Sequence, residues 1–242
     1  MCSSDLANVH IVNFDMPSSR CQHGTMTAHR DGYHHGDLRN ALVASAVRLI
    51  ETSGTSSFSL REAARDVGVS ANAAYRHFDD KSALMTAVAA FGFRQLATQM
   101  VAAMATAAAH RAKEPASVAG FKAVGRAYVE FAVAHPELFR VMFGACGVEC
   151  RKAGPGDDAT ADPWSLLGQS LDALVADGLL ATERRPSTEL KAWSVVHGFA
   201  SLALDGLASM PTAADRALAL EALLDFAVTG LCAQTPAWGD SR

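Results

Sequence analysis

Residues 59–84 read SLREAARDVGVSANAAYRHFDDKSAL, and this stretch indicates two short helices joined by a glycine turn. Ser59 and Glu62 have the spacing of a capping box, in which each side chain accepts a hydrogen bond from the other residue's backbone N–H. A helix is therefore expected to begin near Leu60. Gly68 stands where that helix must end in a left-handed conformation, which a side chain would disfavour.

A second, shorter helix is expected directly after this turn. Ser70 is its candidate N-cap, and the helix carries mostly polar and small side chains up to Phe78. Ala63, Ala64 and Ala74 are small enough to let the two helices cross closely. Two short helices that cross steeply over a tight turn form a helix-turn-helix, which enters a groove of DNA.

Helices are also expected on both sides of this motif. Residues 38–50 place apolar side chains at helical spacing, with Asp37 positioned to cap that helix and Gly54 to end it. After Lys81, a helical pattern rich in Ala, Met and Leu runs from residue 82 to about residue 109. The chain has 242 residues, half of them hydrophobic, and few strand-like alternations, so an all-α fold in one large or two modest domains is expected.

The motif resembles the DNA-binding domain of the TetR family of bacterial transcription regulators. The likeness is carried by Ser59, Ala64, Gly68, Val69, Ser70, Tyr75, His77, Phe78, Lys81 and Leu84. Ala63, Asn72 and Ala74 depart from the more usual Ile, Gly and Leu of the family. The resemblance implies a sequence-specific DNA-binding regulator whose long fourth helix leads from the DNA-binding domain into a second domain.

The resemblance also implies the domain boundaries. A three-helix helix-turn-helix domain is expected at residues 33–81, and a helical effector-binding and dimerisation domain at residues 82–234. Residues 1–32 are then a disordered or extraneous extension, and residues 235–242 a flexible tail.

Two readings of the N-terminal segment stay open: Met26 is the natural start, or the segment is a disordered arm. His29, Arg30, His34 and His35 can reach a minor groove or phosphates as such arms do, and a metal site at His34, His35 and Asp37 is the weaker reading.

Candidate DNA contacts lie on the second helix of the motif and at the helix starts. The base-edge candidates are Asn72, Ala73 and Arg76, because an Asn amide pairs with adenine and an Arg fork with guanine. The phosphate candidates are Ser59, Arg61, Ser70, Tyr75, His77 and Lys81. Tyr75 has the alternative of serving the core in part.

The charge balance is a point against DNA binding by a bulk electrostatic field. The chain is formally −4, and basic and acidic residues balance over residues 29–85, so attraction to DNA must be local. Arg39 can join the phosphate-facing rim, together with the helix starts. The acids Glu51, Asp66 and Asp79 are expected to point elsewhere.

A second resemblance lies in the C-terminal part. Trp193, His197 and Gly198 stand in KAWSVVHGFASLALDGL, which is similar to the Trp-His-Gly element of one TetR subfamily, as is HPELFRVMFG at residues 135–144. Trp193 and His197 are four apart and share a helix face. Either they line an effector cavity, or His197 is a core histidine bonded to a neighbouring helix, with Gly198 allowing close packing.

The candidate effector-binding residues are mainly aromatic, which predicts an apolar or aromatic small molecule. They are Phe121, Phe139, Met142, Phe143, Trp164, Trp193 and His197. The alternative for each of them is ordinary core packing.

Cys146 and Cys150 are four apart and suggest a thiol sensor or a soft-metal site, or else a plain pair of cysteines. Gly144 and Gly147 predict that no regular helix forms there. With no His or third Cys nearby, the plain pair is the favoured reading. Residues 151–163 are a loop by composition. No metal and no cofactor are expected.

The last two helical stretches are expected at residues 188–210 and 212–231, joined around Pro211. The second has a broad apolar face, made of Leu218, Leu223, Leu224, Ala227, Val228 and Leu231. The family resemblance implies that two such helices from each subunit form a homodimer, which would pair two recognition helices on a palindromic operator. The interpretation is a homodimeric repressor released from its operator by a small-molecule effector.

Other classes of protein fit the sequence less well. An enzyme would need a catalytic constellation, and the nearest, His197 with Asp205, is separated by eight residues, which is over two helical turns. The alternative function is a ligand-binding helical protein with weak or lost DNA recognition, since Ala71, Ala73 and Ala74 give the second motif helix little polar reach. Five cysteines without zinc-type spacing, no apolar run long enough for a membrane span and no secretory signal predict a cytoplasmic protein.

Overall fold

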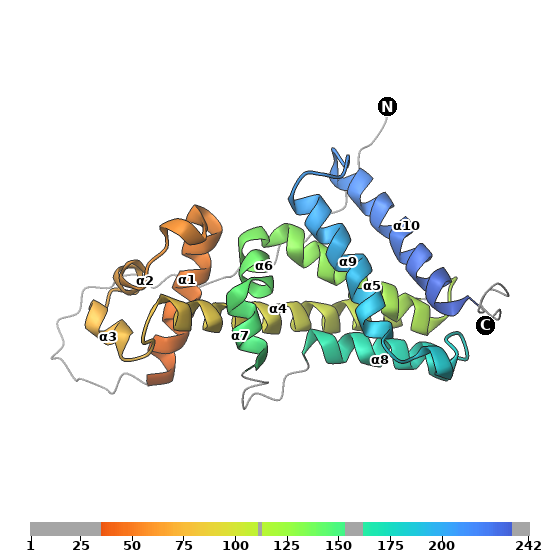
Figure 1. Ribbon diagram of the computed structural model, residues 1–242, viewed down its shortest axis with the longest axis horizontal. Coiled ribbons are helices and arrows are strands. Elements are labelled where there is room, and N and C mark those ends of the chain that lie inside the picture. Colours follow the sequence, from red (N-terminus) through yellow and green to blue (C-terminus); the bar gives the residue numbers. More distant parts are fainter. Residues whose placement is uncertain (1–34, 111–112, 153–161, 234–242) are drawn as a thin grey trace, which may run out of the picture. The chain divides into compact units, whose positions relative to one another are not determined.

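The computed structural model describes residues 35–110, 113–152 and 162–233, which belong to one compact unit. Within these residues the secondary structure is helical, and no strand is present, which confirms the expected all-α fold (Figure 1). Several expectations fall outside the described residues: the start at Met26, the roles of His29, Arg30 and His34, the tail, and residues 153–161 of the expected loop.

The first three helices form the helix-turn-helix domain. They are α1 (His35–Ser57), α2 (Leu60–Val67) and α3 (Ala71–Tyr75). Gly68 ends α2 with a φ of 78°, and the next N–H, that of Val69, donates to the Ala64 carbonyl at 2.9 Å. The Oγ of Ser70 accepts from the Ala73 N–H at 3.2 Å and so caps α3 as predicted. Ala63, Ala64 and Ala74 are all buried at the crossing of α2 and α3, also as predicted.

Three details of this domain differ from the sequence-based expectation. Ser59 caps α2 by accepting from the Glu62 N–H at 3.2 Å, but the reciprocal bond of a capping box is not formed in the described structure. The prediction that Asp37 caps α1 is wrong, because α1 already begins at His35. Gly54 breaks the helical geometry with a φ of 75° and a ψ of 167°, yet the helix resumes and runs on to Ser57.

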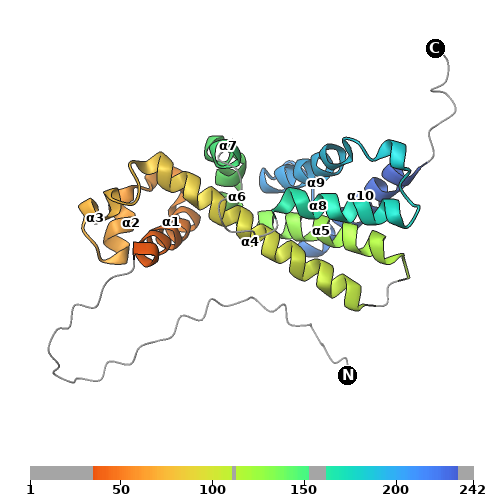
Figure 2. The same ribbon diagram turned by 90° about the horizontal axis from the view of Figure 1, so that it is seen from below.

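Helix α4 (Lys81–Ala109) is shared by the two halves of the described chain. Asp80 caps it, accepting from the Ala83 N–H at 2.8 Å. It packs against α1 near its start and against α5 to α8 along the rest of its length (Figures 1 and 2). The core is continuous along it, so Ala63 and Phe78 of the first domain belong to the same buried cluster as Phe131 and Met142 of the second.

The remaining helices build the C-terminal part. They are α5 (Ala116–Ala134), α6 (Pro136–Phe143), α7 (Ala145–Lys152), α8 (Pro163–Ala176), η1 (Thr182–Arg184), α9 (Thr188–Leu204) and α10 (Ala213–Cys232). Two ion-pair groups join α5 to α10: the largely buried ammonium of Lys122 contacts Asp225 at 2.5 Å and Glu114 at 2.7 Å, and Arg126 pairs with Glu221. No helix among the described residues is both long and apolar enough to cross a membrane.

Two helix boundaries in this part also differ from expectation. Helix α9 ends at Leu204 and not at residue 210, because Asp205 caps it and Gly206 turns the chain with a φ of 67°. The prediction that no regular helix forms around Gly144 and Gly147 is wrong, since α7 runs through Gly147. A Cβ added to Gly147 would lie 1.6 Å from the Met142 carbonyl oxygen, so glycine is required here for the tight passage from α6 to α7.

Candidate DNA-binding surface and effector pocket

The structure exposes seven of the nine candidate DNA-contact residues on α2, α3 and the helix starts. These are Ser59, Arg61, Ser70, Asn72, Tyr75, Arg76 and Lys81. Ala73 and His77 are half-buried, and Ala73 packs partly against the core. Tyr75 is 42% exposed, so part of the residue is covered by its neighbours and part remains accessible at the end of α3.

Two cations near this surface brace the motif. The Arg39 guanidinium of α1 lies 4.4 Å from the centroid of the Phe78 ring and donates to the His77 carbonyl at 3.3 Å. Lys81 donates to the Thr55 carbonyl at 2.8 Å and lies 5.6 Å from the ring centroid of Phe58. The Lys81 ammonium is thus directed to the connection between α1 and α2, a contact that local sequence patterns do not indicate.

Two of the three acids in this domain are engaged internally, in line with the expectation that they point elsewhere. Asp66 accepts from the Ser45 hydroxyl at 2.5 Å and from Arg48 at 2.6 Å, and these two bonds lower its pKa. Glu51 accepts from the Leu138 N–H at 3.0 Å. Burial raises the pKa of Glu51 above its usual value, although the Leu138 hydrogen bond acts in the opposite direction.

An aromatic cluster joins four helices in the C-terminal part. Phe139 and Phe143 of α6 have ring centroids 4.6 Å apart, and the Phe143 centroid lies 4.9 Å from that of His197 on α9. Trp193 lies 5.4 Å from His197, and Trp164 of α8 meets Trp193 edge-on at 5.8 Å. The cluster brings together five of the seven candidate effector-binding residues.

Tyr128 of α5 provides the polar centre of this cluster, and sequence analysis missed it. Its hydroxyl accepts from the Trp193 indole N–H at 3.1 Å and lies 2.7 Å from Nδ1 of His197. The indole can only donate, so the Tyr128 oxygen is the acceptor in its bond with Trp193, whereas the direction of its bond with Nδ1 depends on the tautomer of His197. Tyr128 therefore holds the His197 ring in its orientation.

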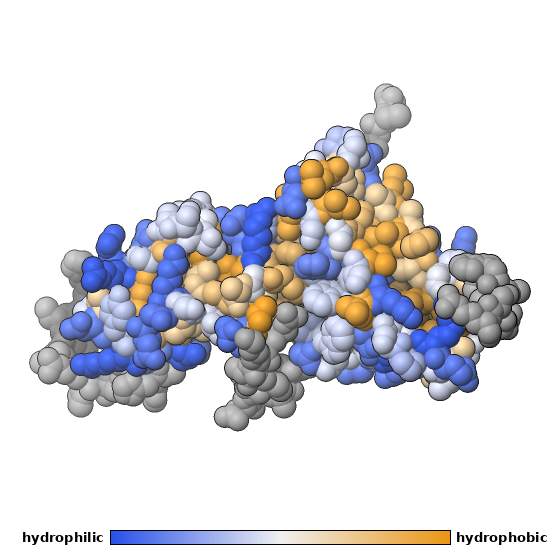
Figure 3. Space-filling model, viewed as in Figure 1, coloured by the Kyte–Doolittle hydropathy of each residue, from blue (hydrophilic) through white to orange (hydrophobic). Residues whose placement is uncertain are grey.

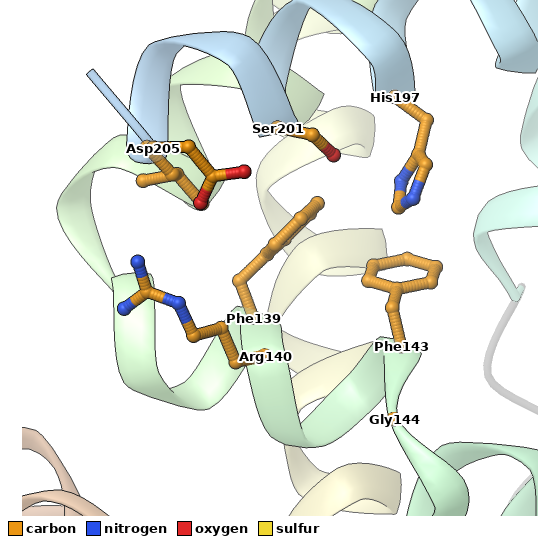
Figure 4. A pocket seen from close by; sticks show the side chains of 8 residues that line it. Phe139, Arg140, Phe143, Gly144, His197, Ser201 and Asp205 are labelled. Carbon is orange, nitrogen blue, oxygen red and sulfur yellow. The ribbon is translucent and has the colours of Figure 1, made fainter. Parts of the chain in front are cut away.

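A pocket of about 250 Å³ opens beside these rings, between α6 and the second half of α9 (Figure 4). It is lined by Phe139, Arg140, Phe143, Gly144, His197, Ser201, Leu204 and Asp205. Figure 4 shows Arg140 and Asp205 on the side away from His197, with the Phe139 ring between them and His197 and the Phe143 ring next to His197. The Arg140 guanidinium pairs with Glu137 at 2.5 Å. The volume is at the small end for a ligand pocket, and the lining combines aromatic faces with a few polar groups.

The structure separates the seven candidate effector-binding residues into three groups. Phe139, Phe143 and His197 line the pocket, whereas Trp164 and Trp193 belong to the adjoining cluster. Met142 is fully buried against α4, where a Cβ on Gly92 would lie 2.5 Å from the Met142 sulfur. Phe121 packs in a second, separate core cluster with Leu171 and Leu174.

Two further pocket residues lie on the helix face that carries His197. Ser201 and Leu204 follow His197 by four and seven positions, so they share its helix face. The predicted role of Gly198 in close packing is wrong within this chain, since a Cβ there would meet no atom within 4 Å.

The cysteine pair lies on α7. Cys146 and Cys150 are both half-buried and pack against the main core cluster. No group of three or more His, Cys, Asp or Glu residues able to hold a metal ion occurs in the described part of the chain.

Comparisons with known proteins agree with both halves of this description. Residues 42–88 match the family profile "Bacterial regulatory proteins, tetR family", and residues 121–227 match "Tetracyclin repressor-like, C-terminal domain". No curated protein matches the chain.

Solved structures share the architecture. A protein of unknown function from Rhodococcus sp. RHA1 is 31% identical over 83% of this chain and 98% of its own, with a TM-score of 0.64. A TetR family transcription regulator from Marinobacter aquaeolei VT8 is 19% identical, over 78% of this chain and 95% of its own, with a TM-score of 0.52. RolR in complex with resorcinol is 13% identical, over 84% of this chain and 96% of its own, with a TM-score of 0.56. The last two likenesses concern the fold alone.

Proposed function

Because this chain belongs to the TetR family of bacterial regulatory proteins, which are DNA-binding transcription regulators and not enzymes, we propose that it is a homodimeric repressor of a palindromic operator. A small-molecule effector releases it from the DNA. The DNA-binding domain comprises residues 33–81, and residues 82–234 bind the effector and dimerise. The Trp193–His197–Gly198 element supports our assignment of the chain to the Trp-His-Gly subfamily.

The exposed second helix of the motif is the observation that carries the proposal. Asn72 and Arg76 are both exposed on α3 and its C-cap, and they can form paired hydrogen bonds to adenine and guanine edges in the major groove. Ser59 and Ser70 mark helix starts whose N–H groups can face phosphates. Two of the acids in this domain, Asp66 and Glu51, accept hydrogen bonds from other groups of the chain, which directs their carboxylates away from this contact.

The effector is a small apolar or aromatic molecule that binds beside Phe139, Phe143 and His197. The 250 Å³ pocket supports this assignment, since it offers aromatic faces on one side and polar groups on the other. An effector that prefers the DNA-free conformation by ~1–3 kcal/mol would lower operator affinity several-fold or more.

The test is selection of bound duplexes from a random DNA pool by the purified full-length chain, with Arg76→Ala in parallel. We expect a palindromic consensus for the wild type, which Arg76→Ala weakens or blurs at one base pair by about 1–3 kcal/mol. Arg94→Ala is the matched control, because Arg94 is an exposed arginine on α4 outside the helix-turn-helix domain, and it should leave the consensus unchanged.

Two results would contradict the proposal. No enrichment at low salt would mean that the chain is a ligand-binding helical protein without DNA recognition. Binding with no sequence preference, equal in Arg76→Ala and Arg94→Ala, would remove α3 as the recognition helix. The salt dependence of DNA affinity separates these two cases. A protein that does not recognise DNA shows no affinity that falls as the salt concentration rises.

A further inference from the structure

Glu51 connects the two halves of the described chain by a hydrogen bond to a helix start. Its Oε1 accepts from the backbone N–H of Leu138, 87 residues further along the chain, at 3.0 Å. Leu138 is the third residue of α6, and the N-cap residue of α6, His135, makes no side-chain capping bond. Glu51 therefore takes the capping position that residues next to a helix usually fill, and it does so from α1.

Little else can satisfy the first turn of α6. Pro136 has no N–H, and the Phe139 N–H already donates to the His135 carbonyl at 2.8 Å. That leaves the N–H groups of Glu137 and Leu138 for capping. The Glu51 carboxylate holds one of these two, and as an anion it also suits the positive end of the helix.

The same short helix forms one wall of the pocket. Phe139 directly follows Leu138, and Arg140, Phe143 and Gly144 complete the contribution of α6 and its C-cap to the lining (Figure 4). A helix of eight residues has just over two turns, so a molecule that shifts the α6 backbone at Phe139 also shifts the neighbouring Leu138 N–H.

Helix α1 also packs against α4 and α6, and its other side-chain hydrogen bonds to distant parts of the chain hold it to the DNA-binding motif. Ser45 and Arg48 bond to Asp66 on α2, and Arg39 bonds to the His77 carbonyl behind α3. Glu51 lies one turn after Arg48 on the same helix. One uninterrupted stretch of α1 thus carries both the bonds to the recognition motif and the bond to the pocket helix.

The carboxylate is retained at an electrostatic cost. Glu51 is half-buried, and burial raises its pKa, so the folded protein disfavours its charge relative to water. A carboxylate that only decorated the surface would carry no such cost. The hydrogen bond that the Glu51 carboxylate accepts from the Leu138 N–H explains its position.

We propose that Glu51 is the positioning residue through which the effector pocket and the DNA-binding domain are coupled, by way of the Glu51–Leu138 bond at the start of α6. This inference rests on the proposed function. Coupling between two sites is reciprocal for binding free energies, so a duplex that binds at α3 must change the affinity of the pocket for its effector by the same factor by which the effector changes DNA affinity. If the start of α6 carries this coupling, binding of the duplex alone will change it. The coupling can therefore be measured from the DNA side, with no effector in hand.

The experiment is amide hydrogen exchange of the full chain, with and without a duplex selected from the random pool. The readout is peptides that cover α6 (residues 136–143) and peptides that cover α2 and α3. In the wild type, saturating duplex should slow exchange in both. In Glu51→Ala, free α6 should exchange roughly five-fold faster, the effect of losing one helix cap, and duplex should no longer protect it. Protection of α2 and α3 by the duplex should remain.

Two further variants separate coupling from simple destabilisation. Glu51→Gln keeps an acceptor oxygen at the same position and should restore most of the duplex-induced protection of α6. Glu183→Ala, at an exposed acid in η1, should behave as the wild type. A purely structural role for Glu51 would change exchange of free α6 but leave the response to duplex intact.

The outcomes are distinguishable from failure of the proposed function. If a duplex binds and protects α6 equally in wild type and Glu51→Ala, or leaves α6 of the wild type unchanged, the coupling role is overturned while the regulator assignment stands. If no duplex can be selected, the proposed function fails first and this inference falls with it.

Discussion

The hydroxyl of Tyr128 is a single atom that organises the residues beside the pocket. It accepts from the Trp193 indole at 3.1 Å and lies 2.7 Å from Nδ1 of His197, so it ties α5 to two residues of α9. Buried hydrogen bonds of this kind contribute modestly when formed but cost more when one partner is removed. The Tyr128 ring is only 4% exposed, so water cannot easily replace its hydroxyl.

We expect Tyr128→Phe to lower the free energy of unfolding by about 1–3 kcal/mol, because the ring stays packed while the shared oxygen is lost. Urea denaturation followed by circular dichroism measures the difference. Tyr75→Phe is the matched control, since Tyr75 is 42% exposed and its change should be within error. Equal stability of Tyr128→Phe and wild type would mean that the hydroxyl bonds are not formed in solution.

His197 illustrates what could be predicted at this scale. The sequence left two readings open, a pocket residue or a core histidine bonded to a neighbouring helix. The structure realises both, since Nδ1 is bonded to Tyr128 of α5 while the ring lines the pocket. Tyr128 itself could not be found, because no local pattern specifies which α5 residue faces α9. That register depends on packing between helices distant in sequence.

Local signals explain why the helix-turn-helix was predicted more accurately than the C-terminal part. Ser59, Gly68 and Ser70 act on backbone groups within a few residues, so their positions alone fix where α2 ends and α3 begins. The same logic failed at α7. Gly147 was taken as a helix breaker from its propensity, but the structure uses it for contact with the Met142 backbone, which is a tertiary requirement.

The close approach at Gly147 has a measurable consequence. A Cβ there would lie 1.6 Å from the Met142 carbonyl oxygen, so Gly147→Ala must displace α7 from the end of α6. We expect a loss of about 1–3 kcal/mol in the free energy of unfolding, which is typical of overpacking. Gly120→Ala is the control, because a Cβ at that position in α5 meets no atom within 4 Å and alanine favours helices. Comparable stability of the two variants would show that α6 and α7 do not meet as described.

At the scale of the whole molecule, the surface of α9 and α10 is more apolar than a solvent-facing helix pair requires. Large side chains are exposed along it: Leu190, Leu202, Leu207, Leu218 and Phe226. Hydrophobic residues gather over these two helices in the space-filling view (Figure 3). Contiguous apolar surface of this kind usually marks an interaction site, and two helices per subunit suit the proposed four-helix dimer interface.

The dimer proposal predicts that charge placed on α10 will separate the subunits. Leu218 is 73% exposed and Phe226 is 69% exposed in the single chain, so the folded monomer should tolerate a glutamate at either position. A dimer that covers these positions would have to bury the charge, which is unfavourable. We expect Leu218→Glu with Phe226→Glu to shift the mass in sedimentation equilibrium from dimer to monomer and to abolish tight binding of a palindromic duplex, because one recognition helix reads only a half-site. Val101→Glu makes the same exchange at an exposed position of α4 and should remain dimeric. A double variant that stays dimeric would place the interface elsewhere on the molecule, whereas a monomer that still binds the full palindrome with wild-type affinity would separate dimerisation from DNA recognition.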